Sequence, residues 1–364
     1  MLKHVVGFFE VPQLLPQFTY SNEVVERPTQ PLHEYLDMTS PRIVSVFGAT
    51  GLQGGAVVDA LLKNGAFVPR AISRDPDSEA SKKLKARGVQ VVKGDPLDKA
   101  GLVSVLRDSE AVFAVTVPVF FYPNMEGQGE LVQGKNIVDA AKEVGVKFFI
   151  WRLVNFTIVS LPSLSKISGG KYKNAVHYEG KHIKASSKRG LISSTEKEAV
   201  REYLESSGLT HASLFLPGFL ENMYRTVKKT SNDYNIAIPI MKAEDLRSLT
   251  WISRDLPAAV LALLNNYTDP TKKINGKTYP VVSAIISGTK LAELAEKILG
   301  VEVTYTTLPP KGLAPMDEMF LAHAEYGGLY SATPIPNPDL VALGMKFSTV
   351  EEFLEIELKP RFGQ

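Results

Sequence analysis

The feature that most constrains this chain is a glycine turn between an apolar run and a helical pattern. Residues 43–47 are mostly apolar, and Gly48, Gly51 and Gly54 follow in the order G-x-x-G-x-x-G. In dinucleotide-binding folds the first glycine makes a tight turn, the second lets backbone approach the pyrophosphate, and the third lets the helix pack against the strand. The helix start then directs its free N–H groups at the anion. We therefore expect a dinucleotide at this turn.

Short apolar runs alternate with helical patterns further along the chain. We expect strands at 43–47, 68–73, 89–93, 111–115 and 147–151, and helices at 52–64, 79–87, 99–106 and 129–144. Continuous apolar strands separated by helices favour a parallel sheet covered on both faces, with right-handed crossovers. The predicted fold class is α/β, a doubly wound Rossmann sheet whose ligand crevice lies at the carboxyl ends of the strands.

The alternation ends after the fifth strand, and this divides the chain into parts. Later helices are expected at 196–207, 255–265, 291–299, 316–326 and 350–358, with a strand at 212–216. We interpret residues 1–40 as a Pro-rich disordered or misannotated tail and 41–216 as the NADP-binding Rossmann domain. Residues 217–364 form a smaller, partly interleaved α+β lobe that closes a substrate or effector pocket.

Composition excludes several classes of protein. The chain has 41 Lys and Arg against 39 Asp and Glu, which gives no electrostatic case for nucleic acid or an acidic membrane surface. There is no cysteine, so disulfides and thiol nucleophiles are excluded. The histidines show no metal-ligand spacing, so no metal is expected. No apolar run approaches the roughly 20 residues that span a bilayer. The expected location is the cytosol, with access to the nucleus.

The residue after the second strand distinguishes the two nicotinamide cofactors. NAD-binding folds place an acidic residue there, whereas this chain has Ser73 and Arg74. A guanidinium group offers a planar fork of donors that suits a 2′-phosphate, so we expect NADP(H). The alternative is an ordinary surface arginine paired with Asp75 or Asp77.

The glycine turn, Arg74 and several segments further along the chain resemble the motifs of the NmrA-like family, which is a branch of the atypical short-chain dehydrogenases/reductases. The resemblance runs from about Pro41 to the C-terminus. Its further pieces are Ser73-Arg74-Asp75-Pro76, Val92-Lys93-Gly94-Asp95, Gln133-Gly134-Lys135, His177-Tyr178-Glu179-Gly180-Lys181 and Leu216-Pro217-Gly218-Phe219-Leu220-Glu221-Asn222.

The resemblance implies a role for each cofactor-binding residue. Arg74 would bind the 2′-phosphate, Asp95 would lie near the adenine, and Lys181 would bind the nicotinamide ribose. The pyrophosphate would contact Gly48, Ala49, Thr50, Gly51, Leu52 and Gln53, with Gly54 completing the turn. The ribose and nicotinamide would lie along Thr116, Val117 and Pro118, and Phe219, Leu220, Glu221 and Asn222 would cover the nicotinamide end.

The chain departs from the family pattern in three segments. Residues 152–159 follow the fifth strand where the family has a Ser-Leu-Pro-like turn, and residues 182–195 separate Lys181 from the next helix. Residues 1–37 precede a natural family start. One hypothesis is that these are gene-model additions, an untranslated stretch and two retained introns. The other is genuine insertion, which surface loops tolerate. Transcript reads spanning all three in frame would exclude the first.

Short-chain dehydrogenases usually transfer a proton through a Tyr-x-x-x-Lys pair on one helix. Tyr224 and Lys228 have this spacing but follow the sixth predicted strand, so we interpret the match as chance. Tyr178 and Lys181 lie near the expected place but one residue too close together. Lys181 and Tyr178 are nevertheless the catalytic candidates. The alternatives are a solvated lysine and a tyrosine that packs against the sheet edge.

Two functions remain open from the sequence. The first is an NADPH-dependent oxidoreductase acting on a small carbonyl, quinone or activated alkene. The second is a non-catalytic sensor of the NADP/NADPH ratio that regulates a transcription factor through protein–protein contact. The imperfect Tyr and Lys spacing favours the sensor, whereas Lys181 and the aromatic run 120–122 favour the enzyme.

Overall fold

A computed structural model describes residues 41–116, 129–154, 171, 192–230, 233–312, 314–327 and 334–362. The described residues all belong to one compact unit, Pro41–Gln364. The first 40 residues, predicted to be a tail, lie outside the described part.

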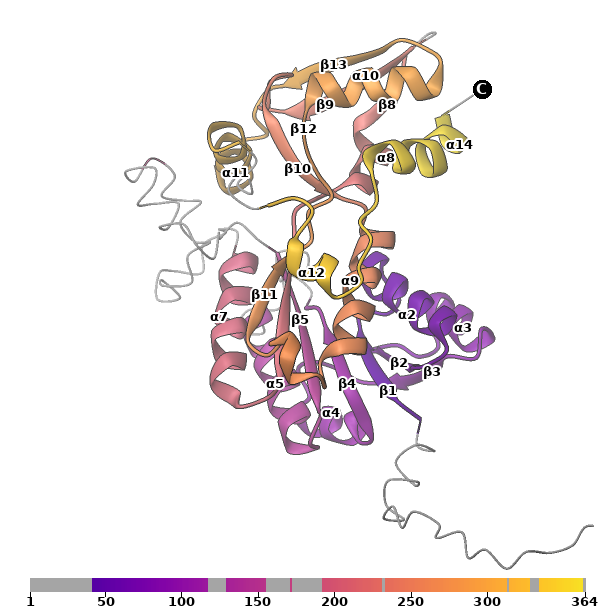
Figure 1. Cartoon of the computed structure of the whole chain (residues 1–364), viewed down its shortest axis with the longest axis vertical. Helices are drawn as coiled ribbons and strands as arrows, with labels where there is room; N and C mark the ends of the chain where they lie inside the picture. Colours follow the sequence, from indigo (N-terminus) through magenta and orange to yellow (C-terminus); the bar gives the residue numbers. More distant parts are fainter. Residues whose placement is uncertain are drawn as a thin grey trace, which may run out of the picture. The chain divides into compact units, whose positions relative to one another are not determined.

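The centre of the fold is a seven-stranded sheet in which every neighbouring pair is parallel. Its strands are β1 (Ile43–Phe47), β2 (Val68–Ser73), β3 (Gln90–Lys93), β4 (Ser109–Ala114), β5 (Phe148–Val154), β6 (His211–Leu216) and β11 (Lys277–Pro280). The spatial order is β11-β6-β5-β4-β1-β2-β3 (Figure 1). The chain order reverses between β1 and β4, which is where open α/β sheets bind their ligands. The predicted doubly wound Rossmann sheet is confirmed.

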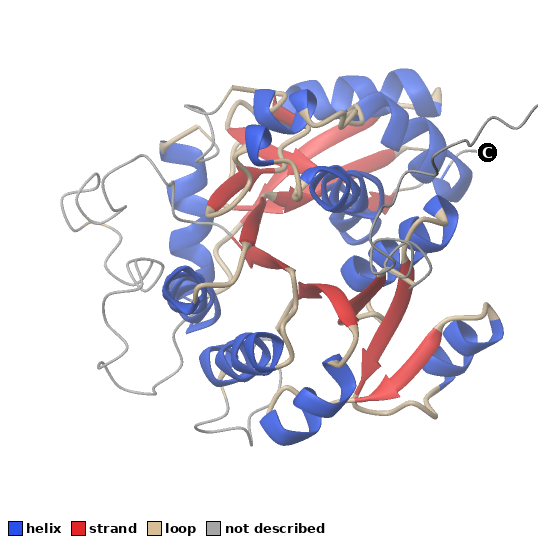
Figure 2. Ribbon diagram, turned by 60° about the horizontal axis from the view of Figure 1, so that its bottom comes forward, coloured by secondary structure: helices blue, strands red, loops and turns tan. Residues whose placement is uncertain are grey.

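Helices cover both faces of this sheet (Figure 2). One face carries α2 (Leu52–Asn64), α3 (Glu79–Ala86) and α9 (Ile252–Asn266), and the other carries α4 (Lys99–Leu106), α5 (Glu130–Glu143) and α7 (Ile192–Ser207). Val46, Leu61 and Leu263 share one buried cluster. Phe149 and Val200 belong to the other. Because both faces are buried, the inner strands are mostly apolar, and their polar side chains such as Ser45 and Arg70 are buried as well.

A smaller α+β lobe follows β6 and has a core of its own. Its two three-stranded sheets are β12-β10-β7 and β13-β9-β8. The strands are β7 (Gly218–Phe219), β8 (Val227–Lys229), β9 (Tyr234–Pro239), β10 (Leu246–Thr250), β12 (Ala284–Ser287) and β13 (Val303–Leu308). The helices are α8 (Met223–Thr226), α10 (Gly288–Leu299), α11 (Ala314–Glu325), α13 (Val350–Phe353) and α14 (Lys359–Phe362), with short helical turns at Leu220–Asn222 and Leu354–Leu358. Although α9, β11 and α12 (Pro338–Ala342) are late in sequence, they pack in the Rossmann part, and the short helical turn Pro270–Lys272 joins α9 to β11.

Two elements extend further than their local sequence predicts. Strand β5 continues to Val154 because Arg152, Leu153 and Val154 pair with the last residues of β6. Helix α7 begins at Ile192 rather than at residue 196. The first residues of segment 152–159 and the last of segment 182–195 therefore lie in regular elements. The gene-model hypothesis for these segments stays a prediction.

Candidate functional site

The glycine turn after β1 has the backbone geometry that a phosphate-binding turn needs. Gly48 has φ +65°, and a Cβ there would lie 2.7 Å from Cγ1 of Val115. The N–H of Gly51 donates to the carbonyl of Gly48 at 2.9 Å. A Cβ on Gly54 would lie 2.7 Å from the backbone nitrogen of Ala49, so the start of α2 passes directly against the turn. Side chains are therefore excluded at Gly48 and Gly54.

The N-terminus of α2 is open to an anion. Its N-cap is Gly51, and no side chain caps the helix. The first N–H groups of a helix have no partner within it, and the helix dipole places partial positive charge there. Thr50 and Leu52 are exposed beside this end, whereas Ala49 is buried beneath it. The Gln53 amide oxygen is buried and has no hydrogen-bond partner among the described residues. An orphaned acceptor of this kind fits a hydroxyl of a bound nucleotide.

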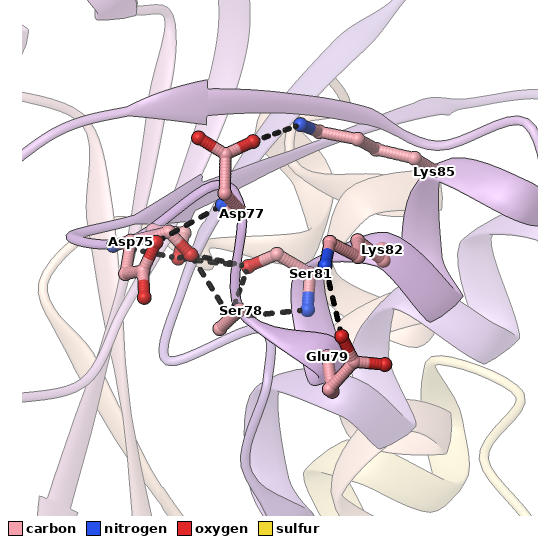
Figure 3. A network of polar contacts seen from close by, with 8 residues as sticks. Asp75, Asp77, Ser78, Glu79, Ser81, Lys82 and Lys85 are labelled. Atoms are coloured by element: carbon pink, nitrogen blue, oxygen red, sulfur yellow. Dashed lines mark hydrogen bonds and ion pairs between the residues drawn. The ribbon is translucent and has the colours of Figure 1, made fainter.

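Arg74 directly follows β2, and the residues after it form a network of hydrogen bonds (Figure 3). The backbone carbonyl of Asp75 lies within hydrogen-bonding distance of three serine hydroxyls, those of Ser73 and Ser78 at 2.9 Å and that of Ser81 at 2.7 Å. Ser78 also caps α3. Arg74 is exposed on this turn, beside the carboxyl end of β2. This is the place from which an arginine reaches a 2′-phosphate.

The two acidic residues considered as alternative partners of Arg74 each form an interaction on this turn or with α3, which does not exclude a contact with Arg74. The Asp77 carboxylate forms an ion pair with Lys85 of α3, with 3.3 Å between the two atoms. The Asp75 carboxylate accepts the backbone N–H of Asp77 at 3.0 Å (Figure 3).

The ends of β3 and β4 bring two further predicted residues to the same edge of the sheet. Asp95 follows β3 and is half-buried, and its carboxylate accepts the N–H of Leu97 at 2.9 Å. Thr116 follows β4 and is buried. Because β1, β2, β3 and β4 are parallel neighbours, the structure places Gly48, Arg74, Asp95 and Thr116 along one carboxyl edge.

Thr116 belongs to a buried ionic network that the sequence did not predict. The Lys197 ammonium contacts the Glu130 carboxylate at 2.6 Å, and both side chains have no exposed surface. The ammonium also donates to the hydroxyl of Thr116 at 2.6 Å and to its backbone carbonyl at 3.2 Å. The Thr116 hydroxyl donates to Glu130 at 3.0 Å. Burial lowers the pKa of Lys197 and raises that of Glu130, and the opposite charge of each partner acts against that shift.

A second glutamate joins this network to the start of α5. The Glu196 carboxylate accepts the backbone N–H of Glu130 at 2.6 Å. A Cβ on Gly129 would meet that carboxylate, so a side chain there would have to displace the end of Glu196. Trp151 of β5 donates its indole N–H to the carbonyl of Lys197 at 3.1 Å. The network therefore connects β4, β5, α5 and α7.

The segment after β6, which was predicted to cover the nicotinamide end of the cofactor, contributes to helix capping and to the core of the small lobe. Glu221 is buried, and its carboxylate accepts the N–H groups of Ile252 at 3.2 Å and Ser253 at 2.8 Å, which caps the start of α9. Leu220 is fully buried in the core of the small lobe. Phe219 is half-buried, with the Arg152 guanidinium 5.7 Å from its ring centre. The expectation that this segment, including Asn222, contacts a cofactor stays a prediction.

The catalytic candidates Tyr178 and Lys181 lie outside the described residues, as do the predicted cofactor-binding residues Val117 and Pro118. The other tyrosine–lysine match is described, and it does not lie on one helix. Helix α8 ends at Thr226, so Lys228 is in β8, and the Tyr224 hydroxyl donates to Glu357 at 2.7 Å.

No group of three or more His, Asp or Glu residues in the described ranges is placed to hold a metal ion. Among the helices that the structure describes, none combines the length and apolar character needed to cross a membrane.

Comparison with known proteins agrees with this geometry. An NmrA-like family domain-containing protein of Dictyostelium discoideum is 30% identical over 275 residues, which cover 73% of this chain and 80% of the relative. An NmrA-like family domain-containing oxidoreductase of Aspergillus flavus is 27% identical over 326 residues, covering 85% and 91%.

Solved structures share the fold. NmrA, a negative transcriptional regulator, in complex with NADP has a TM-score of 0.64 at 15% identity, covering 89% of this chain and 97% of that one. An NADPH-dependent quinone oxidoreductase of Escherichia coli in complex with NADPH has a TM-score of 0.59 at 22% identity, covering 85% and 98%. A model of the NmrA-like family matches residues 40–354. The chain therefore belongs to the NmrA-like family.

Proposed function

We propose that this chain binds NADP(H) at the carboxyl edge of its Rossmann sheet and acts as an NADPH-dependent oxidoreductase. The observation that carries the binding proposal is the turn at Gly48, Gly51 and Gly54. Two of its glycines leave no room for a side chain, and the helix that follows has no side-chain cap. A pyrophosphate would accept the free N–H groups there.

Arg74 supports NADP over NAD. It lies where an NAD-binding fold has an acidic residue, on a turn in which three serine hydroxyls hydrogen-bond to the carbonyl of Asp75. A guanidinium would form two parallel hydrogen bonds to a 2′-phosphate, and NAD lacks that phosphate.

The proposed substrate is a small carbonyl compound, a quinone or an activated alkene. Bound NADPH would supply the hydride, and a proton must reach the reduced substrate. Lys181, identified by the family resemblance, would hold the nicotinamide ribose and donate that proton. The related oxidoreductase of Aspergillus flavus, of which the match covers 91%, supports a reductase.

Two measurements on the full chain test this proposal. Calorimetric titration should give NADPH binding, and NADPH absorbance should fall when carbonyls, quinones or activated alkenes are added. The Lys181→Ala variant should lose turnover and keep most of its NADPH affinity, because the pyrophosphate and 2′-phosphate contacts remain. A chain that binds no NADPH would contradict the whole proposal.

A redox sensor is the second function we propose, because the one described Tyr-x-x-x-Lys match is divided between α8 and β8. In that role the chain would bind NADP(H) without turnover and would contact a regulatory protein, such as a transcription factor, in the cytosol or nucleus. NADPH binding with no activity on the whole panel, and an interaction with a regulator that changes with the NADP/NADPH ratio, would favour the sensor.

A further inference from the structure

The buried Lys197–Glu130 pair lies where three parts of the chain meet at the carboxyl edge of the sheet. Thr116 is the last described residue after β4, Glu130 begins α5, and Lys197 is in the first half of α7. One ammonium group contacts both Thr116 and Glu130. The position of the end of β4 therefore depends on a side chain from a helix 81 residues away in sequence.

The hydrogen bonds of Lys197 indicate positioning rather than catalysis. A lysine ammonium has three N–H donors, and here three acceptors take them: the Thr116 hydroxyl, the Thr116 carbonyl and the Glu130 carboxylate. No donor is left over for a substrate. Unpaired charges are very costly in a protein interior, so a buried pair that also fixes a backbone carbonyl constrains that carbonyl strongly.

The end of β4 is adjacent to the glycine turn. Val115, which precedes Thr116, has Cγ1 only 2.7 Å from where a Cβ of Gly48 would be. Strands β1 and β4 are also the neighbours between which the chain order reverses. A dinucleotide whose pyrophosphate binds at Gly48 would extend its nicotinamide half across this point.

We propose that Lys197 and Glu130 are positioning residues that hold the end of β4 at Thr116 in place for the nicotinamide half of NADP(H). The adenine half would depend on Arg74 and Asp95, which follow β2 and β3 on the opposite side of β1 from β4. This inference rests on the proposed NADP(H) binding. It assigns a role to two charged residues that neither the glycine turn nor the Tyr and Lys pattern explains.

The test compares two ligands that share the adenine end. NADPH carries the nicotinamide half, whereas adenosine 2′,5′-bisphosphate carries the adenine and the 2′-phosphate alone. The main variant is the double substitution Lys197→Met with Glu130→Gln, which removes both charges and keeps the side-chain sizes. The dissociation constant for NADPH should rise about tenfold, because a displaced carbonyl misplaces the groups around it. Affinity for the bisphosphate should stay within about twofold of wild type.

Two further variants make the result decisive. Glu130→Gln alone keeps an amide oxygen beside the Lys197 ammonium but removes its counter-charge, so a thermal melt must first show that this variant is folded. It should weaken NADPH binding by about threefold with the same ligand selectivity. Tyr203→Phe is the matched control, because it removes a 2.6 Å hydrogen bond from α7 to Asp139 of α5 without touching β4. It should leave both affinities unchanged.

The outcomes separate this inference from the binding proposal. If folded Glu130→Gln or double-variant protein loses affinity for both ligands equally, or for neither, the pair does not position the nicotinamide half. If wild-type protein binds neither ligand, the proposed NADP(H) site itself is wrong.

Discussion

Gly54 packs so closely against the backbone of Gly48 that it cannot carry a side chain. A Cβ on Gly54 would lie 2.7 Å from the nitrogen of Ala49 and closer still to the Gly48 carbonyl. Backbone atoms cannot move aside as a flexible side chain does. Helix α2 therefore starts directly on the turn, and its N–H groups face the carboxyl edge of the sheet.

We expect Gly54 to be needed for the stability of the fold and Gly51 for NADPH binding. Gly54→Ala should destabilise the fold by about 1 to 3 kcal/mol through overpacking. Gly51→Ala should leave the melting temperature nearly unchanged, because Gly51 has φ −101° and its added Cβ would lie 3.4 Å from the nearest atom. The same methyl group would obstruct the pyrophosphate, so NADPH affinity should fall at least about tenfold. Thermal melts and calorimetry measure both effects. Normal NADPH affinity in Gly51→Ala would count against the turn as the pyrophosphate site.

Arg74→Ala should lower affinity for NADPH and leave affinity for NADH nearly unchanged. A charge-assisted pair with a phosphate contributes about 1.5 to 3 kcal/mol, which corresponds to a loss of roughly 10- to 150-fold. Arg87→Ala is the matched control, because Arg87, at the C-terminal end of α3, is exposed like Arg74 and pairs with Asp59 of α2. Equal losses for both cofactors would mean that Arg74 does not contact the 2′-phosphate.

The Arg42–Glu110 pair should make stability depend on acid pH. Burial acts to raise the pKa of Glu110, but hydrogen bonds from Arg42 and Tyr267 and the charge of Arg42 lower it below its ordinary value of 4.5. A lowered folded pKa stabilises the protein above pH 4.5, and that contribution disappears as pH falls through the folded pKa.

Glu110→Gln should therefore cost about 1 to 2 kcal/mol at neutral pH and progressively less in acid. Urea unfolding at several pH values measures this. Glu79→Gln, in the exposed pair with Lys82, serves as the control and should change little at any pH. A constant cost of Glu110→Gln from neutral pH to below the folded pKa would contradict the lowered pKa.

Asp255 should be essential for joining α9 to the small lobe. It is fully buried, and its carboxylate accepts the N–H of Trp251 at 3.0 Å, the N–H of Ser348 at 2.9 Å and the Ser348 hydroxyl at 2.7 Å. Asp255→Ala leaves these donors buried without a partner and should cost about 3 kcal/mol or more. The fraction of Asp255→Ala protein that still folds should bind NADPH with wild-type affinity. A melting temperature equal to wild type would show that water replaces the carboxylate.

Local sequence patterns predicted the regular part of the fold well. Strands 43–47 and 68–73 and helices 52–64 and 99–106 have the predicted bounds, because each is set by a continuous apolar run or a nearby turn. The end of β5 was predicted too early. Its last residues are extended because they pair with β6, and such pairing between distant segments leaves no local pattern.

The Lys197–Glu130 pair was missed for a similar reason. The two residues are 67 positions apart, and charged side chains are normally exposed. One signal in the sequence was available. Lys197 shares a helical stripe with Val200 and Leu204, both fully buried, and a lysine on an apolar stripe points to a buried partner.

The central claim is that the carboxyl edge of the Rossmann sheet binds NADP(H), and its most direct test is calorimetric titration of the full chain with NADPH and NADH under the same conditions. We predict one NADPH bound per chain, at least about tenfold more tightly than NADH. No binding of either cofactor, or tighter binding of NADH, would contradict the account.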